Sequence, residues 1–152
     1  MMVTERPFLT LKETRKFMTI EELIENFELM ENWEDRYKYV IDLGKAMPPM
    51  PEEDKTEENK VRGCMSQVWF KFLPSQANPP RLEFLADSDA FIVKGLAAIL
   101  HLIYSGKTRE EAQKINLEEL FKKLGLEGHL SMNRRNGFYA MAERIQTAVQ
   151  NV

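Results

Sequence analysis

Residues 59–72 read NKVRGCMSQVWFKF, and within them the periodicity of the chain changes. Before this stretch, apolar residues recur every three or four positions, as they do in helices. From Val68 onward they alternate, and Val68, Phe70 and Phe72 share one face, which predicts a half-buried strand. The same stretch contains Cys64, the single cysteine of the 152 residues, directly after a glycine. It therefore raises two questions: which sheet forms here, and what the thiol does.

Two further segments are expected to join this strand. Residues 81–87, RLEFLAD, place Leu82, Phe84 and Ala86 on one face. A short strand is also expected at residues 59–62, just before the cysteine. The connections have no room for crossover helices, so the strands should pair antiparallel. The sequence therefore predicts a small three-stranded antiparallel sheet.

Two helices are predicted before the sheet. Thr19 followed by Glu22 forms a capping box in front of a helical apolar stripe. Asn32 caps a second helix, which the prolines of MPPMP end. Residues 1–17 lack helical periodicity, and we expect a poorly ordered N-terminal extension there. Residues 18–152 are then expected to form a single domain.

The chain after the sheet is predicted to be helical. Residues 89–105 are apolar on most of the helix circumference, and Gly106 supplies a stop. Two shorter helices should begin at Thr108 and Asn116, and Ser131 or Asn133 should begin the last. The last helix turns these residues inward: Phe138, Met141, Ala142, Ile145 and Val149. Helices segregated from a small antiparallel sheet define an α+β fold.

Composition excludes several classes of function. The chain has 43% hydrophobic and 30% charged residues, as ordinary globular proteins do. A net charge of -3 gives no basic field for nucleic acid. The most apolar stretch, residues 90–104, is too short to span a bilayer and is interrupted by Lys94 and His101. With one cysteine and no secretory signal, the chain is expected to be cytoplasmic, with no membrane partner.

The thiol of Cys64 allows several interpretations. A lone cysteine is often an inert buried residue, and the chain would then be a non-catalytic binding module. Cys64, however, lies outside every apolar stripe, and Gly63 beside it would let another backbone approach. A metal site is not expected, since one cysteine and two histidines cannot close one. A cysteine hydrolase would pair Cys64 with His129, while His101 is expected at the surface. Sulfur exchange needs no base, no cofactor and no second cysteine in the chain.

The segment GCMSQVW, residues 63–69, resembles the active-site loop of the SufE family of sulfur-acceptor proteins. Three further blocks resemble the family in the same order. They are NWEDRYKYVIDLGKAMP at residues 32–48, DSDAFIVKGLAAIL at 87–100 and HLSMNRRNGFYAMAERI at 129–145. The resemblance extends over residues 19–149.

This resemblance implies a sulfurtransferase-like accessory protein of iron–sulfur cluster assembly. A pyridoxal-phosphate-dependent cysteine desulfurase, SufS-like or CsdA-like, would pass persulfide sulfur to Cys64 and be stimulated in turn. The sulfur would then reach a SufBCD-like scaffold. The pyridoxal phosphate belongs to the desulfurase, so no cofactor is expected on this chain. Six residues match the family around the thiol: Gly63, Ser66, Gln67, Trp69, Arg134 and Gly137.

The chemistry of a persulfide leads to a hypothesis for how the thiol works. We expect Cys64 to alternate between a sheltered and an extended position, because an exposed persulfide is short-lived. Shelter would raise the thiol pKa, and the start of the last helix and Arg134 could offset that rise if they lie nearby. The alternative for Arg134 is a solvated or capping side chain. Trp69 is expected to pack with partial exposure. Met65 stands where relatives often carry a polar residue.

Overall fold

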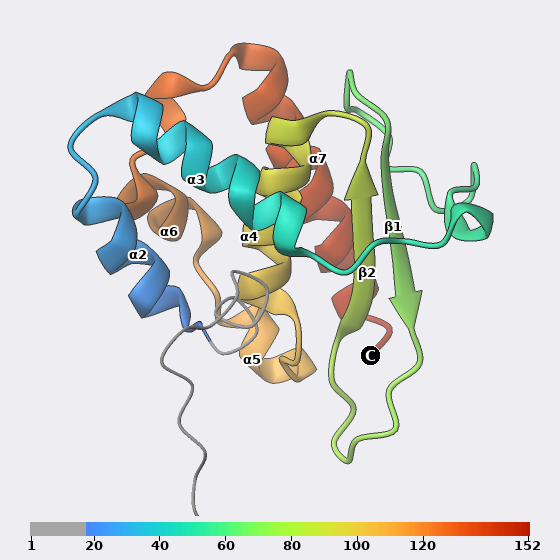
Figure 1. Cartoon of the computed structure of the whole chain (residues 1–152). Helices are drawn as coiled ribbons and strands as arrows, with labels where there is room; N and C mark the ends of the chain where they lie inside the picture. Colours follow the sequence, from blue (N-terminus) through green and yellow to red (C-terminus); the bar gives the residue numbers. More distant parts are fainter. Residues whose placement is uncertain (1–17) are drawn as a thin grey trace, which may run out of the picture.

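Helices lie on one side of a two-stranded sheet in the computed structural model, which describes residues 18–152 (Figure 1). The expectation for residues 1–17 lies outside this description. The elements in chain order are α2 Ile20–Glu28, α3 Trp33–Ala46, η1 Glu52–Asp54, β1 Val68–Leu73, β2 Glu83–Ser88, α4 Phe91–Tyr104, α5 Arg109–Gln113, α6 Leu117–Leu124, η2 Glu127–His129 and α7 Met132–Val149. The result is an α+β arrangement.

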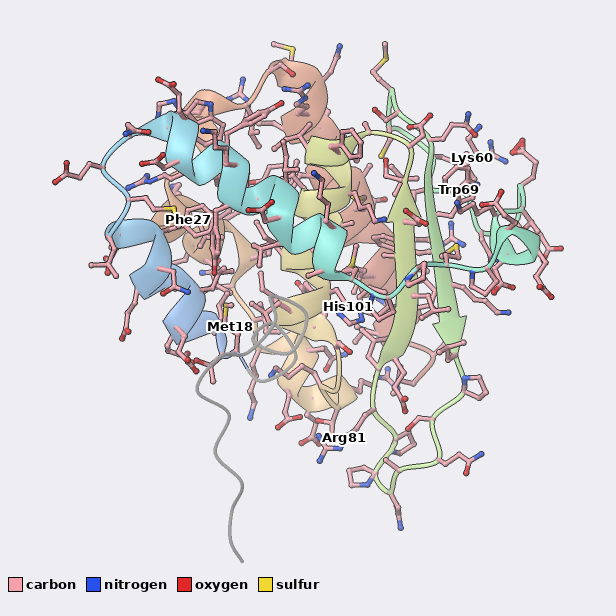
Figure 2. All side chains as sticks on the ribbon, in the orientation of Figure 1. Met18, Phe27, Lys60, Trp69, Arg81 and His101 are labelled. Atoms are coloured by element: carbon pink, nitrogen blue, oxygen red, sulfur yellow. The ribbon has the colours of Figure 1, made fainter. Side chains whose placement is uncertain are left out.

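The described sheet has two strands, so the prediction of three was wrong. Strands β1 and β2 pair antiparallel, with Val68 opposite Ser88 and Phe72 opposite Phe84. Residues 59–62 contribute only an isolated bridge, in which Lys60 lies opposite Trp69. Figure 2 shows these two residues beside β1, on the side away from the helices.

The third strand stops short for two local reasons. Gly63 has a φ of 90°, so the chain turns away from β1 immediately after the bridge. In addition, the N–H group of Asn59, which faces β1, donates to Thr56 Oγ1 at 3.3 Å, so the ladder does not continue on the other side of the bridge.

The predicted helix caps are present. Thr19 and Glu22 form a capping box, as do Thr108 and Glu111. The cap side chains at the other predicted helix starts also accept backbone hydrogen bonds: Asn32, Asn116 and Ser131. Each satisfies an N–H group that has no partner inside its helix. Local sequence therefore decides where these helices begin.

Helix α4 lies against both α3 and the inner face of the sheet (Figure 1). His101 on α4 is half-buried, because its stripe of the helix faces Phe84. Its Nε2 atom lies 3.0 Å from the Phe84 carbonyl oxygen. The expectation of a surface histidine was therefore wrong. One hydrophobic core extends from α2 to α7.

The outer face of the sheet is covered by the loop that contains η1. Lys71 on β1 pairs with Asp54 at 2.6 Å. The ammonium group of Lys55 lies 5.5 Å from the centre of the Trp69 ring. Trp69 is therefore half-buried, as predicted, but beneath a loop. Within residues 18–152, no helix combines the length and apolarity needed to cross a membrane.

Candidate functional site

Residues 62–66, here called the Cys64 loop, connect the Lys60 bridge to β1. Figure 1 shows this loop at the end of the molecule where α4 and α7 begin. Gly63 adopts a left-handed backbone, and a Cβ atom there would lie 3.2 Å from that of Ala140 on α7. Both the backbone angle and this contact favour glycine beside the thiol.

The Cys64 side chain is half-buried against the first turns of α7. Its Sγ atom lies 3.6 Å from the carbonyl oxygen of Gly137, as a weak donor. A Cβ atom at Gly137 would also lie 3.6 Å from Sγ. Any side chain longer than a methyl group at this position would compete with the sulfur for space. Gly137 thus gives the thiol its room.

Beside the thiol lies a pocket of about 400 Å³. Its floor consists of four buried side chains from two helices: Val93 and Leu96 on α4, and Phe138 and Met141 on α7. Polar residues surround this floor: Ser66, Ser131, Asn133 and Arg134. A second sulfur atom bonded to Sγ would therefore have an apolar environment within reach.

Burial raises the pKa of the Cys64 thiol. The neutral form is favoured because the half-buried sulfur has lost part of the water that would solvate a thiolate. Arg134 lines the same pocket but is exposed, and it does not reverse the shift in this conformation. The expected offset by Arg134 is therefore not seen while the Cys64 loop lies against α7.

The structure brings some predicted residues together and leaves others outside. Ser66, Arg134 and Gly137 line the pocket with Cys64. Gly63 shapes the loop, as its positive φ shows. Trp69 lies on the outer face of the sheet and does not line the pocket.

Gln67 acts through its backbone. Its N–H donates to Asp89 Oδ1 at 3.0 Å, and its carbonyl accepts from Ser88 Oγ at 2.8 Å and from the N–H of Asp89 at 3.2 Å. Ser88, the last residue of β2, and Asp89, which follows it, therefore fix the end of the Cys64 loop. Sequence reasoning did not find this contact, because Ser and Asp before a helix indicate a cap. The first residues of α4 in fact lack a side-chain cap.

Neither histidine is positioned to serve as a base. His129 is exposed, and its ring stacks on Trp33 with the centroids 4.7 Å apart. His101 faces Phe84, and neither His101 nor His129 lines the pocket of Cys64. The hydrolase alternative therefore has no histidine at the thiol. Among residues 18–152, no three metal-binding side chains form a cluster.

Comparison with known proteins identifies related chains. Residues 21–149 match the family model described as SufE: Fe-S metabolism associated domain. An uncharacterized SufE-like protein of Rhizobium meliloti is 45% identical over 133 residues, which cover 87% of this chain and 95% of the relative. A second, from Rhizobium etli, is 46% identical over 137 residues, or 89% and 93% of the two chains.

A solved structure shares the fold. It is the solution structure of a hypothetical protein from Thermus thermophilus, with a TM-score of 0.67 and 19% sequence identity. The match covers 88% of this chain and 97% of the other. At this identity the likeness concerns the fold alone.

Proposed function

The chain belongs to the SufE family, and on that premise we propose that it is a sulfur carrier that holds the transferred atom as a persulfide on Cys64. The observation that carries the proposal is the position of Sγ, beside a pocket of about 400 Å³ with an apolar floor. The sulfur is half-buried, yet it belongs to a surface loop. This combination suits an atom that must be sheltered and later delivered.

The proposed step is an exchange that balances without an oxidant. The Cys64 thiolate attacks the terminal sulfur of a persulfide on a donor protein. A new S–S bond forms on Cys64, the S–S bond of the donor breaks, and the donor cysteine leaves as a thiolate. The proton lost from the Cys64 thiol ends on that leaving thiolate or on solvent. Pyridoxal phosphate, on the donor, supplies the chemistry that generates the persulfide.

Delivery requires the Cys64 loop to move, and its hydrogen bonds support this. Within residues 18–152, no backbone hydrogen bond outside the regular elements involves residues 62–66. The residues on either side are held: Val61 N–H donates to the Val68 carbonyl at 2.8 Å, and Gln67 binds Asp89. The loop can therefore swing between two fixed ends, with Gly63 absorbing the backbone change. In the sheltered position burial raises the pKa of Cys64, so the extended position is the reactive one.

The proposal includes two partners. The donor is a pyridoxal-phosphate-dependent cysteine desulfurase, SufS-like or CsdA-like, whose turnover rises when its persulfide is removed. The recipient is a SufBCD-like iron–sulfur scaffold. We propose that both steps occur in the cytoplasm, where a free thiol persists.

Intact mass spectrometry tests the proposal. The full chain is incubated with a cysteine desulfurase, pyridoxal phosphate and cysteine, and is then weighed. The wild type should gain one sulfur atom, whereas Cys64→Ser should gain none while unfolding at an unchanged temperature. Stimulated desulfurase turnover without any gain of sulfur would contradict the carrier role.

A further inference from the structure

Large hydrophobic side chains are exposed at five positions in residues 18–152: Leu29, Met65, Leu73, Phe91 and Met132. Two of them lie at the pocket of Cys64. Met65 lines the pocket, and Met132, at the start of α7, stands between Ser131 and Asn133, which line it. Phe91, at the start of α4, instead has the ammonium group of Lys45 over its ring, 5.4 Å from the centre. We call Met65 and Met132 the apolar rim. Figure 1 shows their two segments at one end of the molecule.

Met65 meets any protein that reaches Cys64 through this pocket. Adjacent Cα atoms are about 3.8 Å apart across a trans peptide, so Met65 cannot move away from Cys64. At the moment of transfer the donor sulfur must come within about 2 Å of Sγ, the length of an S–S bond. Because Met65 lines the same pocket as Cys64, a donor that reaches the thiol through this pocket contacts the Met65 side chain.

The exposure of Met65 indicates what that donor surface is like. Its side chain is 82% exposed and Met132 is 68% exposed, so both have apolar area to bury in a complex. Methionine is flexible and adapts to a partner surface. The pocket lining contains one charged residue, Arg134, and no carboxylate. Nothing in this lining would pair with a basic donor surface.

We propose that the apolar rim docks the sulfur donor and that the donor surface around its persulfide is apolar. Met65 is then the contact that determines which donor binds. This inference rests on the proposed function and specifies its donor. Burial of the thioether side chain then contributes to association, because apolar surface leaves water. Burial of Met65 affects docking and leaves the exchange chemistry of Cys64 unchanged.

The test compares Met65 variants in the sulfur-gain assay with a cysteine desulfurase, over a range of concentrations of this chain. Met65→Gln keeps the length of the side chain but makes it polar. It should raise the half-saturating concentration about tenfold, equivalent to about 1.4 kcal/mol, with the maximal rate unchanged. Met65→Leu keeps the side chain apolar, so its half-saturating concentration should be close to that of the wild type. Leu29→Gln is the matched control, since Leu29 is 81% exposed at the end of α2 and does not line the pocket, and it should have no effect.

A second measurement separates docking from loop structure. Iodoacetamide needs no docking surface, so it should alkylate Cys64 at the same rate in the wild type and in Met65→Gln. An altered alkylation rate would assign the effect to the loop and overturn the inference. Equal saturation of Met65→Gln and wild type would overturn it as well, while the gain of sulfur would leave the proposed function standing. A wild type that gains no sulfur would refute both.

Discussion

The sulfur of Cys64 is held by a weak contact to the Gly137 carbonyl and by its apolar neighbours. Few interactions must be broken to release it, since within the described residues no backbone hydrogen bond outside the regular elements fixes residues 62–66. The same neighbours disfavour the thiolate, because they exclude water. Cys64 is therefore protected while its loop lies against α7 and more reactive when the loop extends.

This shift predicts a pH dependence of alkylation. The pKa of Cys64 is raised in the folded chain, so between the unfolded and the folded pKa the folded chain holds more neutral thiol. The rate of reaction with iodoacetamide should rise through a midpoint at higher pH than in the same chain unfolded by urea. The shift also stabilises the fold below the unfolded pKa, and this stability is lost as pH rises through the folded pKa.

The measurement is the alkylation rate at a series of pH values, followed by intact mass. The urea-unfolded chain serves as the reference for an unburied thiol. A folded midpoint equal to or below that reference would show that Cys64 is not sheltered in solution.

At the scale of elements, the crossing of α3 and α4 positions the floor of the pocket. Gly95 on α4 packs directly on the backbone of α3, where an added Cβ atom would overlap the carbonyl oxygen of Val40. Gly44 on α3 approaches α4 closely as well, with an added Cβ atom 2.7 Å from the Gly95 nitrogen. This close approach sets the position of Val93 and Leu96, on the same helix as Gly95.

Gly95→Ala should destabilise the chain by about 3 kcal/mol or more, because the clash is with backbone and no side chain can rotate to relieve it. Helix propensity alone predicts the opposite sign, a gain of about 1 kcal/mol. Gly128→Ala is the control, since an added Cβ atom there has nothing within 4 Å. Urea unfolding measures both variants. A Gly95→Ala protein as stable as the wild type would show that the two helices can move apart freely.

Most element boundaries could be predicted from the sequence because they depend on local chemistry. The capping boxes at Thr19 and Thr108 and the cap at Ser131 each use a side chain close to the N–H group that it binds. The third strand could not be predicted correctly. Its length depends on the positive φ of Gly63 and on the hydrogen bond from the Asn59 N–H group to Thr56 Oγ1, and the alternation of apolar residues reveals neither.

The site was predictable to a smaller extent. Cys64 was recognised as functional because it lies outside the apolar stripes and beside a glycine. A sheltered position for the thiol was predicted, but the residues that form the pocket were not, because Val93 and Leu96 look like any other buried residues of an apolar helix. Periodicity identifies which face of a helix is buried, but it does not reveal which buried residues adjoin a cavity.

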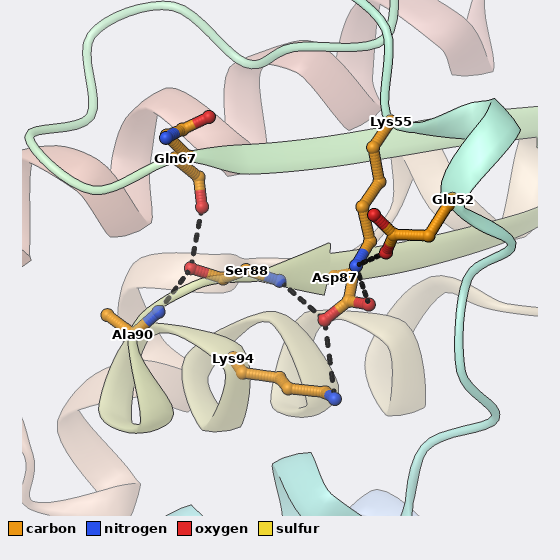
Figure 3. Close-up of polar contacts among 7 residues, drawn as sticks. All are labelled: Glu52, Lys55, Gln67, Asp87, Ser88, Ala90 and Lys94. Carbon is orange, nitrogen blue, oxygen red and sulfur yellow. Dashed lines mark hydrogen bonds and ion pairs between the residues drawn. The ribbon is translucent and has the colours of Figure 1, made fainter.

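At the scale of the whole molecule, one buried carboxylate joins parts that are distant in sequence (Figure 3). Asp87 on β2 is 6% exposed. It pairs with Lys55 of the outer loop at 3.5 Å and with Lys94 of α4 at 3.3 Å. It also accepts a hydrogen bond from the N–H of Ser88, whose Oγ donates to the carbonyl of Gln67. The outer loop, the sheet, α4 and the end of the Cys64 loop thus share one polar centre.

Removal of this carboxylate should loosen the molecule on both sides of the sheet. Asp87→Ala leaves Lys55 and Lys94 without their common partner, and breaking such a buried pair costs about 3–5 kcal/mol. Both lysine side chains are about a quarter exposed, at 24% and 22%, so water compensates in part and we expect about 2 kcal/mol. Asp87→Asn keeps an acceptor for Ser88 and should lose less than the alanine variant. Urea unfolding of both variants at neutral pH separates the contribution of the ion pairs with the two lysines from that of the hydrogen bond to Ser88. If the two variants were equally stable, the hydrogen bond to Ser88 would contribute nothing, and if both matched the wild type, Asp87 would not hold the layers together.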